Sequence, residues 1–390
     1  MECSVNILHV CESLPGGPAS YLDEILPAQR KRFGERNVVL LAPASQMEHL
    51  AQSGGSDVVG YPRTGRNLSS LARLAVALQR QLARQRPDIL HLHSSLAGAI
   101  GRLVASTTGF QGRVVYCAHG WAIDPGRPSR GRDLFRLAER ALYLATDAII
   151  NISPHEDAFL PAAWRRSGKV RLIPSGIAAA PAEAQPAEPR PCDGQEPDQP
   201  MCWRLLFVGR TDYQKGFDLL LQEMALLSSA RLVVAGGHVV EATRALACPP
   251  NVAILGWLQR SGVRELMARA DFVVMPSRWE GMPLVALEAM RAGKPVIASA
   301  GGPFPHIIDH GRTGLLVDTR EPGFLGRALE GLAREDAVRM GAAASEAFEQ
   351  RFTSATMNDQ LFRLYEELQS APPARVRLSG LAHPAPLAGG

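Results

Sequence analysis

Short apolar runs alternate with longer amphipathic stretches through the first part of the chain, from residue 5 to residue 173. The apolar runs are rich in valine, isoleucine and leucine, as parallel strands covered on both faces are. The stretches between them, such as 68–86 and 133–145, have helical periodicity. Such alternation predicts parallel βαβ units. We expect strands at 5–10, 38–41, 57–59, 89–93, 114–117, 148–152 and 170–173.

The same alternation restarts after residue 200 and predicts a second α/β domain. Residues 321–370 are expected to be mostly helical. Strands are expected at 204–208, 231–235, 252–255, 272–275, 296–298 and 315–317. Segment 178–200 is rich in proline, alanine and glutamate, which predicts an exposed linker. The predicted domains are therefore 1–177 and 201–350, followed by a helix at 351–370 and a disordered tail at 371–390.

The bulk composition narrows the class of protein. A chain of 390 residues is long enough for about two domains, and 46% apolar residues is ordinary for a soluble protein. A net charge of +4 argues against a nucleic-acid partner. The six cysteines show no CxxC pairing or metal-ligand spacing, which indicates a reducing, cytoplasmic location. No signal peptide is visible, and no apolar run reaches the ~18 residues that span a bilayer. Contact with the inner membrane would thus be peripheral, on its cytoplasmic face.

Two glutamates eight positions apart follow the strand expected at 272–275. Gly281 and Pro283 end that strand and open a helix, with Glu280 at the start of the helix and Glu288 inside it. A helix rises about 1.5 Å per residue, so eight positions separate the carboxylates by up to ~12 Å. This separation suits two ends of one elongated ligand better than a shared acid/base pair. The alternative is two surface glutamates on an amphipathic helix.

A second cluster of candidate residues follows the strand expected at 204–208. Glycine, Arg210, a short loop, Lys215 and Gly216 lead into a helix, so two cations lie at a helix N-terminus, which carries partial positive charge and free N–H groups. Such a site favours a phosphate-bearing ligand. The alternative is a solvated arginine and lysine in a βα loop.

Three segments of the first domain also carry candidate chemistry. Gly16 and Gly17 lie between the first strand and a helix, where either a close backbone approach to a ligand or a plain tight turn would explain them. His119 ends the strand at 114–117, and histidine can also simply cap a strand end. His91 and His93 point the same way along one strand. A metal site there would need a third ligand, and we find none in the sequence.

These motifs resemble the E-x7-E signature and phosphate loop of retaining glycosyltransferases of family 4, which have the GT-B fold. The resemblance covers nearly the whole chain apart from the linker and the tail. It implies an α/β fold of two Rossmann-like, doubly wound domains that face each other across a cleft. The last helix often crosses back to the first domain in this fold. The implied reaction moves a hexose-type sugar, with retention, from a nucleotide diphosphate sugar to a polysaccharide or lipid-linked glycan of the exopolysaccharide or lipopolysaccharide type.

The resemblance also implies roles for particular residues. Glu280 and His119 would lie at the transferred sugar as the catalytic pair, and Glu288 would bind the ribose. The diphosphate would be held by Arg210 and Lys215. Further donor contacts would come from Gly16, Gly17, Gly281, Met282 and Pro283. The segment around His93 and Ser94 resembles the acceptor side of bacterial polysaccharide transferases.

No Asp-x-Asp occurs in the chain, although glycosyltransferases of the other major fold use that motif to hold a divalent metal. We therefore expect no metal and no cofactor, because the cationic side chains neutralise the diphosphate instead. Two other functions stay open at this point. A sugar-nucleotide epimerase of the same fold would consume the donor without releasing nucleoside diphosphate. A catalytically inactive scaffold of a biosynthetic complex need not keep Arg210, Lys215, Glu280 and Glu288.

Overall fold

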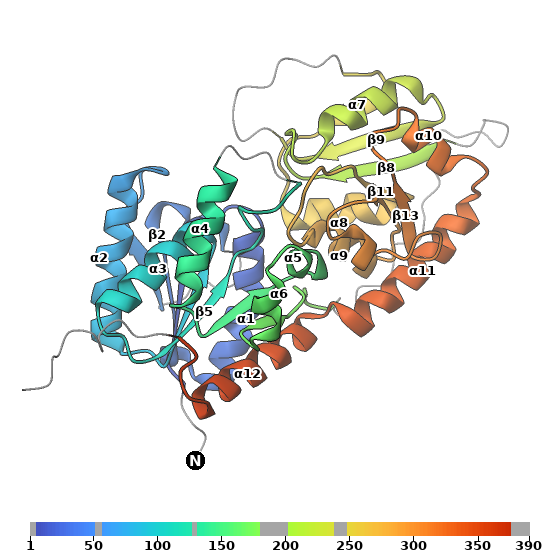
Figure 1. The fold of residues 1–390 in the computed structure, drawn as a ribbon. Helices are drawn as coiled ribbons and strands as arrows, with labels where there is room; N and C mark the ends of the chain where they lie inside the picture. Colours follow the sequence, from blue (N-terminus) through green and yellow to red (C-terminus); the bar gives the residue numbers. More distant parts are fainter. Residues whose placement is uncertain (1–4, 51–56, 127–130, 180–201, 238–247, 376–390) are drawn as a thin grey trace, which may run out of the picture. The chain divides into compact units, whose positions relative to one another are not determined.

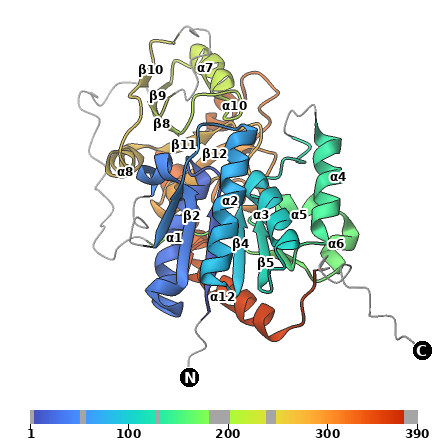
Figure 2. The same ribbon diagram turned by 90° about the vertical axis from the view of Figure 1, so that its left-hand side faces the viewer.

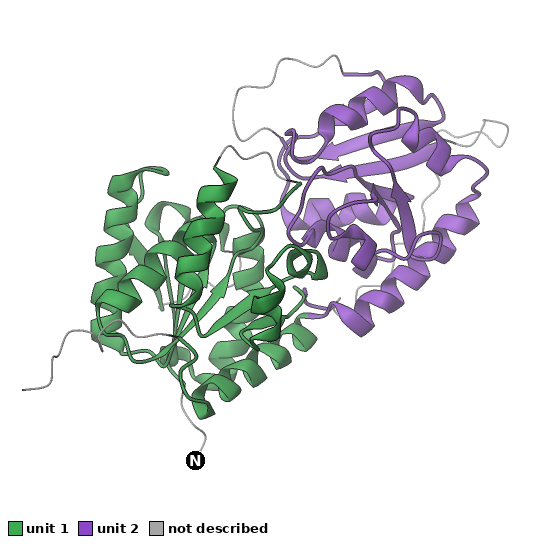
Figure 3. Ribbon diagram, viewed as in Figure 1, with its two compact units in different colours: residues 1–175, 354–390 green, residues 176–353 purple. Residues whose placement is uncertain are grey.

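The computed structural model describes residues 5–50, 57–126, 131–179, 202–237 and 248–375 (Figure 1). The chain divides into two compact units, coloured separately in Figure 3. Unit 1 contains Met1–Ser175 and Ser354–Gly390, and unit 2 contains Gly176–Thr353. Most of the predicted linker, 180–200, lies outside the described residues.

Unit 1 is built on a parallel sheet of seven strands in the order β3-β2-β1-β4-β5-β6-β7. Every residue of the central strands β1 and β4 is buried, as expected for apolar strands covered on both faces. The strands are β1 (Ile7–Cys11), β2 (Val38–Pro43), β3 (Val58–Tyr61), β4 (Ile89–His93), β5 (Arg113–Cys117), β6 (Ala148–Asn151) and β7 (Val170–Leu172). Each strand expected from the sequence of this unit is confirmed.

Helices cover the sheet of unit 1 on both faces (Figures 1 and 2). They are α1 (Gly17–Phe33), α2 (Leu68–Gln85), α3 (Ser95–Thr107), α4 (Arg132–Tyr143), α5 (Pro154–Ala158), α6 (Ala162–Arg166) and α12 (Ser354–Ser370), with 3-10 turns at Glu35–Asn37 and Ala44–His49. The last helix, α12, packs on α1. Phe362 meets Phe33 with ring centroids 5.4 Å apart, and the Asn358 amide donates to the Glu24 carbonyl at 3.0 Å.

Unit 2 is a second parallel sheet, of six strands in the order β10-β9-β8-β11-β12-β13. Its core joins Phe207, Phe272 and Ile297 on three of the strands to Leu220 and Met340 on covering helices. The strands are β8 (Trp203–Val208), β9 (Ala230–Ala235), β10 (Val252–Ile254), β11 (Phe272–Met275), β12 (Val296–Ser299) and β13 (Gly314–Val317). The helices are α7 (Phe217–Leu226), α8 (Arg260–Arg269), α9 (Leu284–Arg291), α10 (Phe324–Leu329) and α11 (Arg334–Arg351), with a 3-10 turn at Phe304–His306.

The predicted fold class, two Rossmann-like parallel-sheet domains, is confirmed. In each unit the strand order reverses once, between β1 and β4 in unit 1 and between β8 and β11 in unit 2. Loops that leave the carboxyl ends of two such strands diverge to opposite faces of the sheet and open a crevice. The candidate residues follow these strands, apart from His119, which follows β5 next to β4, so the topology places most of them at the two switch points.

The prediction of a disordered tail from residue 371 is wrong for its first five residues. Arg375 is buried and donates to the carbonyls of Phe110 and Gly112, at 2.5 Å and 2.7 Å. Its guanidinium lies 3.2 Å from the buried Asp147 carboxylate, which also accepts from the Ala374 N–H. The composition of the tail did not predict these contacts, because most of them are made by a single arginine. Residues 376–390 lie outside the described part of the chain. None of the described helices is long and apolar enough to cross a membrane.

Candidate active site

In unit 2, two loops that leave the neighbouring strands β8 and β11 are joined by an ion pair. The Lys215 ammonium donates to Oε1 of Glu280 at 2.6 Å, and the Ser277 hydroxyl donates to the same oxygen at 2.9 Å. Glu280 is buried, and the Lys215 side chain is only 18% exposed. Two residues predicted to contact different parts of the donor therefore contact each other.

Further polar contacts tie the same two loops together. Gln214 donates to the Trp279 carbonyl at 3.2 Å, and its own carbonyl accepts from the Arg278 N–H at 2.8 Å. Arg278 also pairs with Asp218 through both guanidinium nitrogens, each 2.7 Å from a carboxylate oxygen. This side-chain hydrogen bond raises the pKa of Arg278 above its usual value. The two loops thus form one cross-linked layer over the switch point.

Arg210 is held by residues of its own loop. Its guanidinium lies 2.9 Å from the Asp212 carboxylate and donates to the Gln214 side-chain oxygen at 2.7 Å. The side chain is 40% exposed, so an anion can reach it without unfolding the loop. Asp212 and Gln214 were not among the predicted site residues.

Gly216 shows why the β8–α7 loop ends in glycine. Its φ is 68°, in the left-handed region that side chains disfavour, and an added Cβ would lie 2.0 Å from the Pro276 carbonyl oxygen. The loop therefore approaches the end of β11 more closely than any other residue would allow. This close approach brings Lys215 within reach of Glu280.

The predicted loop-to-helix transition after β11 is confirmed, with Pro283 as the residue that precedes α9. Met282 and Pro283 are buried, Gly281 is partly exposed, and Glu288 lies partly buried one turn into α9. A pocket of about 620 Å³ opens beside Ser277 and Arg278 and extends to the ends of β12 and β13. At the carboxyl ends of its strands, unit 2 therefore has the two cations Arg210 and Lys215 and the two carboxylates Glu280 and Glu288, with a pocket nearby.

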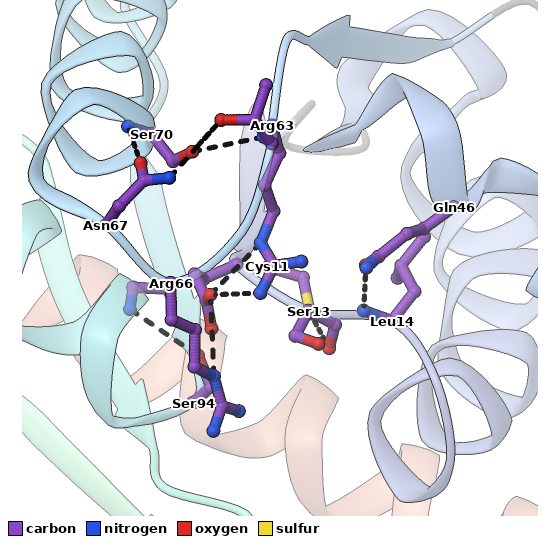
Figure 4. Close-up of polar contacts among 12 residues, drawn as sticks. Cys11, Ser13, Leu14, Gln46, Arg63, Arg66, Asn67, Ser70 and Ser94 are labelled. Carbon is purple, nitrogen blue, oxygen red and sulfur yellow. Dashed lines mark hydrogen bonds and ion pairs between the residues drawn. The ribbon is translucent and has the colours of Figure 1, made fainter. Parts of the chain in front are cut away.

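In unit 1, hydrogen bonds from neighbouring segments fix the residues just before the predicted glycines Gly16 and Gly17. The side chain of Gln46 accepts from the Leu14 N–H at 3.0 Å, and the neighbouring Arg63 donates to the buried Glu12 carboxylate at 2.8 Å (Figure 4). Gly16 has a φ of 89°, which favours glycine. A Cβ added at Gly16 or Gly17 would meet nothing within 4 Å, so the backbone here is open to a ligand.

Behind the predicted sugar-facing His119 lies a chain of hydrogen-bonded histidines. His119 Nε2 is 2.9 Å from His93 Nδ1, and His93 Nε2 is 2.9 Å from His9 Nδ1. His9 Nε2 is in turn 2.7 Å from the side-chain oxygen of Gln29. The chain runs from α1 through β1 and β4 to the end of β5.

The direction of these hydrogen bonds follows from the glutamine at their end. An amide oxygen can only accept, so His9 carries its proton on Nε2 and accepts at Nδ1. Nδ1 of His9 therefore accepts from the Nε2–H of His93. Neutral His93 then has a lone pair on Nδ1, which accepts from the Nε2–H of His119. Nδ1 of His119 is left as a lone-pair acceptor, which can accept a hydrogen bond from a hydroxyl group.

Burial keeps these histidines neutral. Desolvation lowers the pKa of His9 to about 4 and that of His119 to about 3, and it lowers the pKa values of His91 and His93 well below the usual 6.5. At neutral pH His119 is therefore an uncharged acceptor rather than a cation.

Two predictions about this region are wrong. His93 is fully buried, with both ring nitrogens engaged by other histidines, so it does not line an acceptor surface as predicted. A third histidine for a metal site does exist, because His9, His91 and His93 place one nitrogen each within 4.8 Å of one another. His9 was missed because it pairs with His91 only across the sheet, between β1 and β4. A polar residue inside an apolar strand was the available signal.

The ring nitrogens in this cluster are mostly occupied by hydrogen bonds. His9 and His93 bond to each other, and His91 Nδ1 lies 2.7 Å from the hydroxyl of Tyr365 on α12. Only Nε2 of His91 is buried without a hydrogen-bond partner among these rings. The arrangement therefore fits a hydrogen-bonded network better than a metal site, since a metal would displace the His9–His93 bond.

Ser94 and His119 both have unusual backbone conformations for residues with side chains. Ser94 has φ 85° and ψ 157°, and its hydroxyl accepts from the Ala97 N–H at the start of α3. His119 has φ 52°, and the next N–H, of Gly120, donates to the buried Glu156 at 2.8 Å. Burial raises the pKa of Glu156 to about 7. Strain of this kind clusters at functional sites, and here it marks the ends of β4 and β5.

Two family models match the chain. The model described as Glycosyltransferase Family 4 matches residues 15–180, and the model described as Glycosyl transferases group 1 matches residues 203–335. Together they cover much of both units and include His119, Arg210, Lys215, Glu280 and Glu288.

Individual proteins with similar sequences or structures agree with these models. An uncharacterized 41.2 kDa protein in a cps region of Klebsiella pneumoniae is 29% identical over 80% of this chain and 86% of its own length. D-inositol 3-phosphate glycosyltransferase of Corynebacterium diphtheriae is 28% identical over 72% of this chain and 70% of its own. The structure of Anabaena HepE in complex with UDP-glucose superimposes with a TM-score of 0.72, at 19% identity, over 93% of this chain and all of that one.

The buried histidines predict a specific dependence of stability on pH. Their folded pKa values lie below the unfolded value of 6.5, so their contribution is present above pH 6.5 and is lost as pH falls toward about 4. Each histidine contributes up to about 1.4 kcal/mol of unfolding free energy per pH unit in this window. Denaturant unfolding at pH 7, 6 and 5 measures the slope.

The variant His9→Gln should reduce that slope by roughly one histidine's share, because glutamine does not titrate. The matched control is His49→Gln, since His49 is an exposed histidine of the same unit. The same pH dependence in His9→Gln and wild type would contradict the neutral, buried state of His9.

Proposed function

We propose that this chain, which belongs to the group 1 and family 4 glycosyltransferases, transfers a sugar from a nucleotide diphosphate sugar to a polysaccharide or lipid-linked glycan, with retention and without a metal. The observation that carries the proposal is the convergence of Arg210, Lys215 and Glu280 at the switch point of the unit 2 sheet. The cps region named for the Klebsiella pneumoniae relative supports a role in polysaccharide biosynthesis.

The cations of the β8–α7 loop would stabilise the leaving group. When the bond between the anomeric carbon and the phosphate oxygen breaks, its electron pair passes to the phosphate, and the sugar gains oxocarbenium character. Arg210 and Lys215 would bind the diphosphate and lower the energy of that negative charge. Both are already positioned, Arg210 by Asp212 and Lys215 by Glu280, so little reorganisation is needed when the donor binds.

The carboxylates would hold the two ends of the donor. Glu280, fixed by Lys215 and Ser277, would lie near the transferred sugar, and Glu288 on α9 would accept hydrogen bonds from the ribose hydroxyls. The backbone at Gly281, Met282 and Pro283 would line the path between them. An acceptor hydroxyl would then form the new bond to the anomeric carbon.

Unit 1 carries the other residues that we propose to contact the donor. The open backbone at Gly16 and Gly17 would approach the donor phosphates or sugar, and the free Nδ1 of His119 would accept from a sugar hydroxyl. His93 and His9 would act as positioning residues, because their hydrogen bonds set the tautomer and orientation of His119. Ser94 would face the acceptor.

The donor-site assignment predicts that Arg210→Ala and Glu288→Ala each lose activity by about 10²-fold or more, because each removes a charge or hydrogen-bond acceptor that faces the donor. Release of nucleoside diphosphate from mixed donors measures turnover. Thermal-shift titration with UDP, GDP, ADP and their sugars measures binding. UDP-glucose is the ligand in the HepE structure, so UDP compounds are the first to test.

The matched control is Arg312→Ala, an exposed arginine of the same unit that pairs with Asp309 at 3.3 Å. It should behave as wild type. Full activity in both Arg210→Ala and Glu288→Ala would refute the assignment of the donor site.

Metal independence is a second prediction of the proposal. Cationic side chains would neutralise the diphosphate, so activity should persist after treatment with EDTA and should not rise with added Mg²⁺ or Mn²⁺. Nucleotide release after chelation and dialysis measures this. Complete loss on chelation, restored by Mg²⁺ or Mn²⁺, would overturn it. A loss restored only by a metal that histidine prefers would instead point to the cluster of His9, His91 and His93.

Retention predicts the configuration of the product. An α-linked donor should give an α-linked product, which the coupling constant of the anomeric proton reports in an NMR spectrum of the reaction. A β-linked product would show inversion and would remove this part of the proposal while leaving the donor site intact.

A further inference from the structure

Helix α4 presents its apolar side to solvent. Leu134, Leu137, Ala138 and Ala141 recur at helical spacing on one side of the helix, and Leu144 continues the row just beyond its end. These five residues are called the α4 face here. Leu134 is 72% exposed, Leu137 64% and Leu144 54%, and both alanines are exposed as well.

The opposite side of α4 faces the protein, and its one buried residue is charged. Glu139 is the only buried residue among the twelve of the helix, all of which are described. It pairs with the buried Arg102 at 2.9 Å and accepts from the Tyr116 hydroxyl at 3.2 Å. Tyr143 stacks on Trp164 of α6 with centroids 4.4 Å apart. A surface helix ordinarily buries its leucines, whereas α4 buries a glutamate and exposes Leu134 and Leu137.

Exposed cations lie along one flank of the α4 face. Arg136 and Arg140 follow the side of α4 next to Tyr143, and Arg165 and Arg166 are exposed on the adjoining α6. The one exposed acid of α4, Asp133, is paired with Arg136 at 3.2 Å. Figure 2 shows α4 at the outer edge of unit 1 with α6 beside it. The flank is therefore complementary to a negatively charged surface.

We propose that the α4 face is a docking surface for a membrane that carries anionic lipid headgroups. The leucines would enter the boundary between headgroups and acyl chains, and the arginines would lie at the level of the headgroups, as in helices that lie in the membrane interface. This inference rests on the proposed function, because a lipid-linked acceptor would bring the enzyme to a membrane. Helix α4 is the next helix after β5, and His119 lies just beyond the carboxyl end of that strand.

Vesicle binding tests the proposal with the full-length protein. Sedimentation is compared on vesicles of phosphatidylcholine alone and on vesicles in which phosphatidylglycerol replaces part of it. Wild type should bind the anionic vesicles, and the double variant Leu134→Ser, Leu137→Ser should bind them about tenfold more weakly or less, since burying each leucine favours the bound state. The variant Arg140→Gln, Arg166→Gln should weaken binding to the anionic vesicles only and reduce its dependence on salt.

The matched control is Leu68→Ser, Val76→Ser on α2, which changes two exposed apolar residues of the same unit away from the α4 face. It should bind as wild type. The thermal unfolding midpoint should not fall in the leucine variant, because these side chains pack against little. Wild type that does not bind anionic vesicles, or a leucine variant that binds like wild type, would overturn the proposal.

Self-association is the competing explanation of the α4 face. A dimer in analytical ultracentrifugation that the leucine variant abolishes, without any vesicle binding by wild type, would overturn the proposal in favour of a second copy of the chain. Vesicle sedimentation needs neither donor nor turnover. If wild type binds nucleotide but not vesicles, the membrane proposal fails and the proposed function stands. If wild type binds vesicles but not nucleotide, the proposed function fails and the membrane proposal stands.

Discussion

The ion pair between Lys215 and Glu280 is the interaction on which the candidate donor site depends. Its two residues are 65 positions apart in the chain, and their atoms are 2.6 Å apart in the structure. A buried carboxylate is costly unless it is paired and hydrogen-bonded, and Glu280 has both an ammonium and the Ser277 hydroxyl. The pair holds together the loops that leave β8 and β11. Gly216 makes this possible, because only a residue without a side chain allows the loop to approach the Pro276 carbonyl.

The buried histidines of unit 1 follow the same logic without charge. Four imidazoles in or beside the centre of a parallel sheet would be unfavourable if their nitrogens had no partners. They are instead arranged so that His9, His93 and His119 satisfy one another in sequence and Gln29 sets the direction. Tyr365, from the last described helix, bonds to His91 in the same region. The C-terminal segment of the chain therefore helps to build the interior behind a candidate catalytic residue.

The candidate polar groups lie in different surroundings in the two units. Unit 2 places charged side chains in loops at the sheet edge, where solvent and ligand can reach Arg210. Unit 1 places neutral rings inside the sheet and leaves only the last ring, His119, partly exposed. Helix α4 is attached to unit 1 through polar contacts of Glu139 and Tyr143, which leaves its leucines to the surroundings. An ion pair with Arg102 and an aromatic stack on Trp164 hold α4 to the unit while Leu134 and Leu137 stay exposed.

The sequence alone determined the elements and their class. Every strand that the structure shows in the described residues falls on a predicted run. The central strands are covered on both faces and therefore read as continuous apolar runs. The family resemblance of the motifs around Arg210, Lys215, Glu280 and Glu288 also came from local order. The tertiary structure alone decided which of these groups touch. The Lys215–Glu280 pair, the place of His9 behind His93, the burial of His93 and the anchoring of Arg375 all depend on contacts across strands, helices and loops distant in sequence. Such contacts depend on the order of the strands in each sheet. The pattern of apolar residues along the chain predicts where the strands lie, but it does not predict between which strands that order reverses.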